Sequence, residues 1–276
     1  MYKDLEIPEA REILENLKVY TLGVKDLKDV IIPGYNVIRR QADDSEVKIL
    51  TKKYFISQHV DMFDQTVRQL EDYGLNFEVK SIGVNNSGKR HGVNVTFLFP
   101  EMVFDIDGSM TNATLELINS NDGNQNLIRV FGAYRVRCSN GMVIGETLLE
   151  EKRKHYGEGY ELEPINEALD ELGSQFKNFG TMIEKSRDVK MNKNIQRALI
   201  RIGFPRLMVE RLPKMTEKYL SVQQEGIKDW DKLWSVYQAL TNWISNVTVG
   251  RNLQRAAKLQ LGLYDLMKKE IKASAA

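Results

Sequence analysis

The spacing of apolar residues changes near residue 150, and this change constrains the fold more than any other feature of the sequence. Before it, apolar and polar residues alternate over short segments such as residues 93–99, a pattern typical of half-buried strands. After it, apolar residues recur three and four positions apart, as in residues 165–183, which is typical of helices. We therefore predict an α+β protein with a β-rich domain at residues 1–150 and a helical domain or extension at residues 151–276.

The β-rich half is predicted to form a mostly antiparallel sheet with one helix packed across it. Turn residues separate its strand segments, including Asn85-Asn86-Ser87-Gly88 and Ser139-Asn140-Gly141, whose Asn-Gly pair favours a tight hairpin. The crossing helix is predicted for residues 57–73. Its apolar stripe consists of Val60, Phe63, Val67 and Leu70.

The charge balance excludes a chain that is strongly basic as a whole, but it leaves room for a local basic surface. Lys and Arg number 39 against 38 Asp and Glu, so the net charge is +1. The single cysteine excludes an internal disulfide. Because the start of the chain lacks an apolar signal segment and no apolar run approaches the roughly 18 residues of a membrane helix, we expect a cytoplasmic protein without a membrane span.

Sequence signatures of common catalytic sites are missing, including phosphate-binding glycine loops and the Gly-x-Ser-x-Gly elbow. The histidines His59, His91 and His155 lie far apart and lack ligand spacing, so we predict no metal site and no cofactor. Asp105 and Asp107, just before Gly108, are the best candidates for binding Ca²⁺ or Mg²⁺, although Asp and Gly also favour a simple turn at a strand end.

Basic residues gather at two places in the β-rich half, and Lys152 and Arg153 follow just after it. Two lie at a predicted hairpin tip, and others share one face of a predicted strand with the aromatic Phe131. This face either contacts phosphates and bases, or is a solvated surface with ion pairs to nearby glutamates. The candidates are Lys89, Arg90, Arg129, Arg135, Arg137, Lys152 and Arg153.

A second basic stretch covers residues 185–214, which contain nine Lys or Arg and two acidic residues. Lys190, Lys193, Arg197 and Arg201 follow one another at spacings of three, four and four, so they are predicted to form one ridge of a helix. Such a ridge can follow a phosphate backbone. The alternative is a solvated helix face, although such faces usually carry charges of both signs.

Two short motifs carry a family resemblance. A turn with the pattern N-x-N-D-G precedes a strand end with the pattern R-x-x-C-x-N-G, and the matching residues are Asn119, Asn121, Asp122, Gly123, Arg135, Cys138, Asn140 and Gly141. In these residues the chain resembles the phage and plasmid family catalogued as domain of unknown function 932, in which a histidine usually stands at the position of Asn121. The resemblance implies a bacteriophage or mobile-element protein. The layout of short strands with a crossing helix is also similar to phage single-strand annealing proteins of the Redβ/RecT type.

Three functional hypotheses follow. The first is a non-enzymatic, oligomeric protein that binds single-stranded DNA and promotes strand annealing or recombination. The second is a structural or interaction protein that self-assembles, or binds a host protein, through its helical half, where Trp230, Trp234 and Tyr237 form an aromatic stripe that suits either packing or a subunit contact. The third is a metal-dependent nuclease that uses Asp105 and Asp107.

Overall fold

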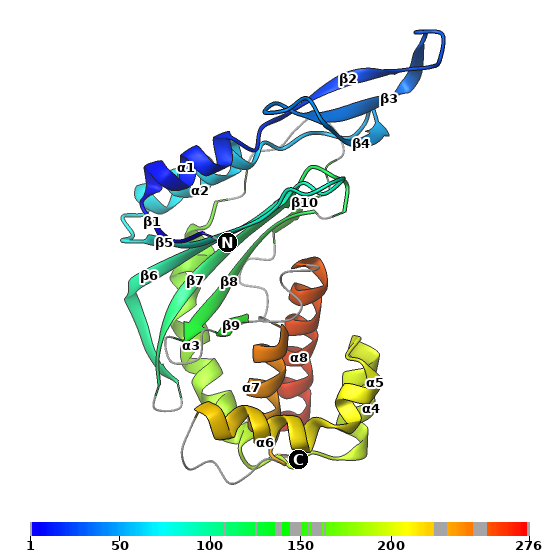
Figure 1. Cartoon of the computed structure of the whole chain (residues 1–276). Coiled ribbons are helices and arrows are strands. Elements are labelled where there is room, and N and C mark those ends of the chain that lie inside the picture. The colour runs from blue at the N-terminus through cyan, green and yellow to red at the C-terminus, as the bar shows by residue number, and fades with distance from the viewer. Residues whose placement is uncertain are drawn as a thin grey trace. The chain divides into compact units, whose positions relative to one another are not determined.

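A computed structural model describes residues 2–106, 109–124, 126–135, 140–143, 151–153, 155, 162, 164–223, 231–244 and 253–274 (Figure 1). It confirms the α+β class, with strands in the N-terminal half and helices in the C-terminal half. The strands are β1 (Tyr2–Leu5), β2 (Val19–Lys25), β3 (Ile31–Arg40), β4 (Glu46–Thr51), β5 (Glu78–Asn85), β6 (Gly92–Ile106), β7 (Ser109–Ser120), β8 (Leu127–Arg135), β9 (Asn140–Val143) and β10 (Glu151–Arg153). The helices are α1 (Ile7–Glu15), α2 (His59–Asp72), α3 (Asn166–Ser186), α4 (Lys193–Ile202), α5 (Arg206–Glu210), α6 (Leu212–Gln223), α7 (Leu233–Trp243) and α8 (Leu253–Ser274).

The strands form two sheets. The larger has the order β1-β5-β6-β7-β8-β10, with β9 also paired to β8, and the smaller has the order β2-β3-β4. The pairings of β1 with β5, β5 with β6, and β8 with both β9 and β10 are antiparallel, as are both pairings of the smaller sheet. The predicted, mostly antiparallel sheet is thus confirmed.

The predicted crossing helix is α2, and its apolar stripe packs on the larger sheet. Phe63 is fully buried and stacks on Phe97 of β6 with ring centroids 5.6 Å apart. One turn and a half further on, Gln69 accepts a 2.7 Å hydrogen bond from the guanidinium of Arg129 in β8. Phe63 thus lies in the buried stripe of the helix, and Gln69 lies half-buried at the edge of that stripe.

The chain forms two compact units, and each is built from three segments that are separate in sequence. The first unit comprises Met1–Glu101, Thr114–Phe131 and Thr147–Asp170, and the second comprises Met102–Ala113, Gly132–Glu146 and Glu171–Ala276. Strands β6, β7 and β8 contribute residues to both units. A domain boundary at residue 150 stays a prediction.

The core of the second unit is aromatic. Phe179 of α3 is fully buried, and its ring lies 6.5, 6.3 and 6.0 Å from the rings of Trp234, Tyr237 and Tyr264. Trp234 and Tyr237 also stack on each other at 5.5 Å. Both are buried packing residues, whereas Trp230 lies outside the described residues.

One local prediction was wrong, and one strand was missed. Asn140 and Gly141 do not form the tight turn, because both already lie in β9, opposite Arg135 and Tyr134. Strand β2 was not predicted, because its alternation is lost: Leu22 is apolar and 48% exposed, so the outward face does not read as polar.

Among the residues that the structure describes, no helix combines the length and apolarity needed to span a bilayer.

Helix α4 is held at both ends by local interactions. The side chain of Asn192 caps it by accepting hydrogen bonds from the backbone N–H groups of Asn194 and Ile195 at 2.8 and 3.0 Å. At the other end Gly203 has a φ of 120°, which a residue with a side chain rarely adopts. The helix therefore begins and ends at defined residues, which fixes the register of its exposed side chains.

Replacing Asn192 with alanine is expected to lower the free energy of unfolding by about 1 kcal/mol, because two backbone donors lose their acceptor. Asn194→Ala is the matched control, since the Asn194 side chain is exposed and makes no cap contact. Urea denaturation of the two variants measures the difference. Equal stability of N192A and N194A would contradict the capping role.

Candidate nucleic-acid interface

Three residues of the predicted basic ridge, Lys193, Arg197 and Arg201, lie on the solvent side of α4, whereas Lys190 lies before the helix begins. We call Lys190, Lys193, Arg197 and Arg201 the α4 basic face; all four are exposed. On the opposite side Ile195 and Leu199 are fully buried, so the helix is amphipathic. Within the part of the chain that the structure describes, none of the four cations forms an ion pair.

Close packing against α8 sets the position of α4. Gly262 of α8 lies so near Ile202 that a Cβ built on the glycine would be 2.7 Å from the isoleucine Cγ2. The lack of a side chain at residue 262 therefore allows the two helices to approach closely. This contact keeps the buried face of α4 against α8 and leaves the α4 basic face directed to solvent.

Lys89 and Arg90 are exposed in the loop between β5 and β6, as predicted. A residue that the sequence did not single out, Arg40, holds this loop. Its guanidinium donates hydrogen bonds to the Asn86 side chain at 2.6 Å and to the backbone carbonyls of Gly88 and Arg90 at 2.5 and 3.1 Å. Arg40 is only 8% exposed, so it holds the loop from the protein interior. Lys89 and Arg90 remain exposed to solvent.

Arg129 does not belong to a basic surface. It is fully buried, and it donates a hydrogen bond to Gln69 of α2. The parity of the strand correctly places Arg129 beside Phe131, but α2 covers that face of the sheet at this point. A guanidinium under a helix cannot reach a phosphate, so we remove Arg129 from the candidate contacts.

The other candidates are placed only by their backbone or not at all. Arg135 ends β8 opposite Asn140, and Lys152 and Arg153 lie in β10 opposite Ile128 and Leu127. Asp105 lies in β6. Arg137, Cys138, Asp107 and Gly108 lie outside the described residues.

The N-x-N-D-G motif lies at the end of β7 and holds the start of α2. The Ser57 carbonyl accepts hydrogen bonds from the side-chain amides of Asn119 and Asn121, at 2.8 and 3.0 Å. The Asn121 side chain also accepts from the Ser57 backbone N–H at 3.2 Å, so it contacts both backbone groups of that residue. All three residues are buried, which makes these bonds strong determinants of the local structure.

The last two residues of the motif complete the turn after β7. The Asp122 carboxylate accepts hydrogen bonds from the backbone N–H groups of His91 and Asn124, at 3.0 and 2.9 Å. Gly123 has a φ of 72°, and a Cβ there would lie 3.2 Å from the Leu50 side chain. Asn121 itself is not in the left-handed backbone region, and its structural role lies in the two hydrogen bonds of its side chain with Ser57.

The histidines that are distant in sequence converge beside this motif. His59 and His91 stack with ring centroids 4.8 Å apart, and Nε2 of His59 lies 3.1 Å from Nδ1 of His91. His155 stacks on Tyr54 at 5.1 Å, and its Nδ1 donates to the Phe55 carbonyl at 3.2 Å. Their separation in sequence did not predict this contact, which arises because separate segments of the chain meet in the folded protein.

The hydrogen bonds assign the protons of the stacked pair. The Asn119 amide, already donating to Ser57, also donates to Nδ1 of His59 at 3.0 Å. His59 must then carry its proton on Nε2 and donate it to Nδ1 of His91. Nε2 of His91 is buried and makes no hydrogen bond of normal geometry. The nearby Leu17 backbone raises the pKa of the His91 ring.

Burial keeps these imidazoles neutral. It lowers the pKa of His91 to about 4, against smaller opposing effects of the Leu17 backbone and Asp122. Burial, and then the neighbouring His91 and His155, lower the pKa of His59 well below its ordinary value. Burial also lowers the pKa of His155.

The buried cluster is not arranged for catalysis or metal binding. The buried cluster consists of the polar residues Ser57, His59, His91, Asn119, Asn121, Asp122 and His155. Each is at most 3% exposed, so a diffusing substrate cannot reach them in this conformation. The Ser57 hydroxyl makes no hydrogen bond, so no base activates it. Among the residues described here, no group of three His, Cys, Asp or Glu side chains is placed to hold a metal ion. The α4 basic face is therefore the better candidate for a functional surface.

Comparison with known proteins gives one match. The family model described as "Domain of unknown function (DUF932)" matches residues 47–262, a range that includes the buried cluster and the α4 basic face. No curated protein and no solved structure matches the chain.

The stability of the protein is expected to fall as the pH is lowered from about 6.5 to about 4, the unfolded and folded pKa values of His91. In this window the unfolded chain binds a proton that the folded protein excludes, so the contribution is complete above pH 6.5 and is lost towards pH 4. Its size is on the order of 3 kcal/mol. Urea titrations at a series of pH values measure it.

His91→Gln is the comparison variant, because it removes this proton site while keeping the carboxyl groups that titrate in the same range. Its stability should depend less on pH than that of the wild type. NMR titration of the His91 ring in the wild type gives the same pKa without a substitution. A ring pKa near 6.5 would contradict the prediction.

Proposed function

This chain belongs to the family of domain of unknown function 932, and we propose that it binds single-stranded DNA through the α4 basic face without catalysing a reaction. The observation that supports this proposal most is the exposure of three aligned cations on α4, with Lys190 just before the helix, none of which has an acidic partner among the described residues. A solvated helix face usually carries both signs of charge, so that each cation has a nearby anion. An unpaired row of cations is suited to an anionic polymer.

The dimensions fit a nucleic-acid backbone. Lys193 and Arg201 are eight residues apart on one helix, which corresponds to a rise of about 12 Å. Cations distributed over this length can contact several successive phosphates of one strand. Lys190 precedes the helix and adds a fourth cation at its N-terminal side.

The preference for a single strand, and a role in annealing or recombination, are part of the proposal. They rest on the similarity in layout to phage single-strand annealing proteins and not on a contact with bases. Lys89 and Arg90, exposed on the loop that Arg40 holds, are proposed as additional phosphate contacts. Annealing needs only that two strands be bound and brought together, so no chemical step is required.

Replacing Lys193, Arg197 and Arg201 with glutamine is expected to weaken binding of a fluorescein-labelled oligothymidylate. It should also flatten the slope of log K against log salt by about two units, because each lost contact with a single strand retains roughly 0.7 of a counterion. Fluorescence anisotropy over a salt series measures both quantities. Duplex DNA of the same length tests the strand preference, and mixing of complementary strands tests annealing.

The matched control replaces Lys28, Lys53 and Lys272 with glutamine, which removes the same charge from exposed sites elsewhere. Its affinity and salt slope should stay close to those of the wild type. Absence of binding at low salt would end the proposal. Equal weakening in the control would show that net charge, and not the α4 basic face, determines binding.

Self-assembly is a second candidate function, and one face of the smaller sheet favours it. Leu22, Val37 and Ile49 lie directly opposite one another on β2, β3 and β4. Leu22 and Ile49 are 48% and 46% exposed, Tyr35 on the same face is 47% exposed, and Val37 between Leu22 and Ile49 is only 8% exposed. Towards the β2–β3 turn Leu27 is fully exposed. Contiguous exposed apolar side chains of this kind often mark protein interfaces.

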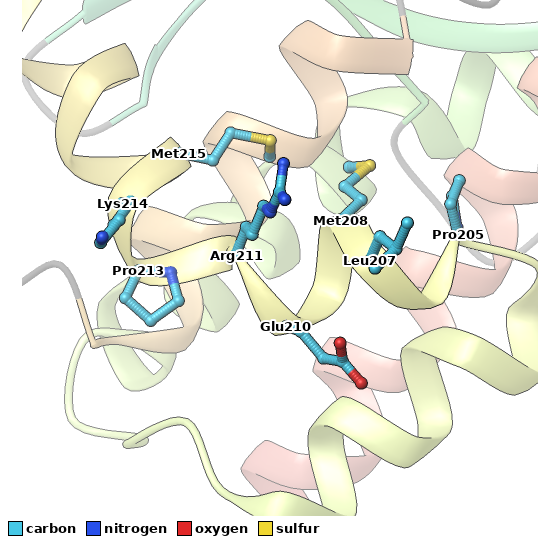
Figure 2. Close-up of a pocket in the computed structure, with 8 residues that line it drawn as sticks. All are labelled: Pro205, Leu207, Met208, Glu210, Arg211, Pro213, Lys214 and Met215. Carbon is cyan, nitrogen blue, oxygen red and sulfur yellow. The ribbon is translucent and has the colours of Figure 1, made fainter.

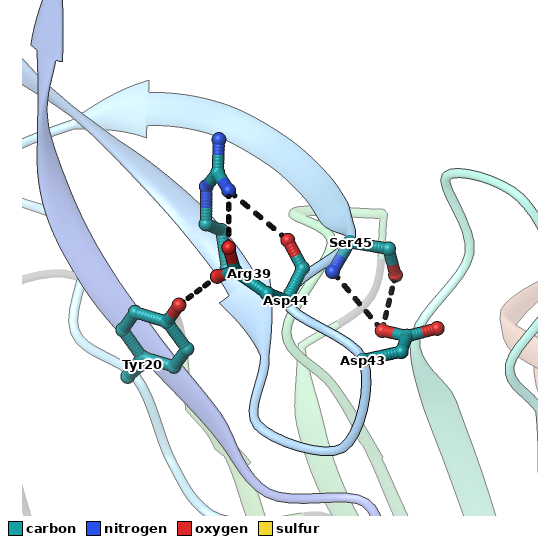
Figure 3. A network of polar contacts seen from close by, with 5 residues as sticks. All are labelled: Tyr20, Arg39, Asp43, Asp44 and Ser45. Carbon is teal, nitrogen blue, oxygen red and sulfur yellow. Dashed lines mark hydrogen bonds and ion pairs between the residues drawn. The ribbon is translucent and has the colours of Figure 1, made fainter.

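Polar contacts fix the other end of this sheet face (Figure 3). Arg39 donates hydrogen bonds to the Asp44 carboxylate at 2.9 Å and to its carbonyl at 3.1 Å, and the Tyr20 hydroxyl donates to the same carboxylate. Asp43 accepts from the backbone N–H and the hydroxyl of Ser45, at 3.0 and 2.6 Å, which closes the β3–β4 turn. The apolar part of the face therefore lies on strands that are held in register.

The double substitution Leu22→Lys and Ile49→Lys is expected to reduce self-association, because two charges would have to be buried in the contact. Sedimentation velocity over a range of concentrations measures the effect. Met110→Lys is the control, because Met110 is 59% exposed and lies on β7. A wild-type chain that remains monomeric at every concentration would exclude this candidate.

A further inference from the structure

A groove of about 1030 Å³ lies on the second unit, between α5 and the start of α6 (Figure 2). Its apolar lining consists of Leu207, Met208, Met215 and the prolines Pro205 and Pro213. Leu207 is 68% exposed and lies beside the other apolar residues of the lining. The volume lies at the upper end of the range for ligand sites, and the lining is largely apolar, as in most such sites.

The sequence explains why the apolar groove stays open. Pro205 precedes α5 and Pro213 lies in the first turn of α6, so the two helices are separate short segments. Val209 and Leu212, each 1% exposed, anchor them to the interior of the unit. Leu207, Met208 and Met215 line the groove instead. No described segment of the chain covers Leu207.

The charges around the groove are unbalanced. Glu210 bonds to Arg206 at 2.8 Å, and Figure 2 shows its carboxylate directed away from Arg211 and Met208. Arg211 and Lys214 line the groove, are exposed, and form no ion pair among the described residues. The groove therefore combines an apolar lining with two free positive charges, which is complementary to a ligand with apolar and acidic groups.

We propose that this groove binds an acidic peptide segment of a partner protein, with an apolar side chain of the peptide against Leu207 and the methionines and its carboxylates on Arg211 and Lys214. Methionine-rich surfaces adapt to different apolar side chains. A single-stranded nucleic acid fits less well, because bases stack on aromatic faces and the lining has none. The proposal is independent of DNA binding by the α4 basic face.

The experiment uses the full chain and a short fluorescein-labelled peptide of alternating glutamate and leucine. Fluorescence anisotropy should show saturable binding, and a peptide with lysine in place of glutamate should not bind. The double substitution Arg211→Glu and Lys214→Glu should reduce affinity by about tenfold or more, the usual effect of losing a charge-assisted hydrogen bond. Leu207→Ser should also weaken binding.

The matched control is the double substitution Lys269→Glu and Lys272→Glu on α8. These two lysines are exposed and three residues apart, like Arg211 and Lys214, so the change in charge and spacing is the same. Peptide affinity should be unchanged in this control. Absence of binding by the wild type, or equal loss in both double variants, would overturn the proposal.

An oligothymidylate is included as a competitor. If it displaces the peptide, and if Leu207→Ser weakens its binding, the groove belongs to nucleic acid and the proposal fails. If the oligonucleotide binds without displacing the peptide, the two surfaces are separate, as proposed. If it does not bind at all while the peptide does, the proposed DNA-binding function fails and the groove proposal stands.

Discussion

The first unit depends on one buried acceptor, the Ser57 carbonyl, which accepts hydrogen bonds from the side-chain amides of both Asn119 and Asn121. Through Asn119 and Asn121 this single buried atom joins the start of α2 to the end of β7, and through His59 and His91 the same set of bonds reaches the start of β6. Buried polar groups are costly unless they are paired, so each member limits the conformations of the others. The resulting network is neutral, since every nitrogen that accepts a hydrogen bond would lose it on protonation.

The positively charged side chains fall into a buried group and an exposed group, which the nearly neutral composition does not reveal. Arg40 and Arg129 are buried, and each donates to neutral oxygens that anchor a loop or a helix. The cations of the α4 basic face and of the groove beside α5 are exposed and lack acidic partners within the described chain. Two kinds of positively charged residue thus have opposite roles, and only the exposed kind is available to other molecules.

The sequence predicted what depends on local periodicity. The antiparallel strands, the crossing helix and the exposure of Lys193 and Arg197 all follow from spacings of two or of three and four residues. It did not predict burial of Arg129, because strand parity identifies a face but not the helix that covers it. Nor could it place His59 beside His91, which is 32 residues away, since that contact depends on tertiary structure.

The burial of every histidine has a consequence for the outer surface. The chain contains three, and none is more than 2% exposed. Imidazole is the side chain that ordinarily changes its charge between pH 5 and 8. With all three kept neutral in the interior, no histidine on the surface can gain or lose a proton across the neutral range. The electrostatic attraction that this protein exerts on an anion is therefore independent of histidine protonation across the neutral range, and salt is the variable that tunes it there.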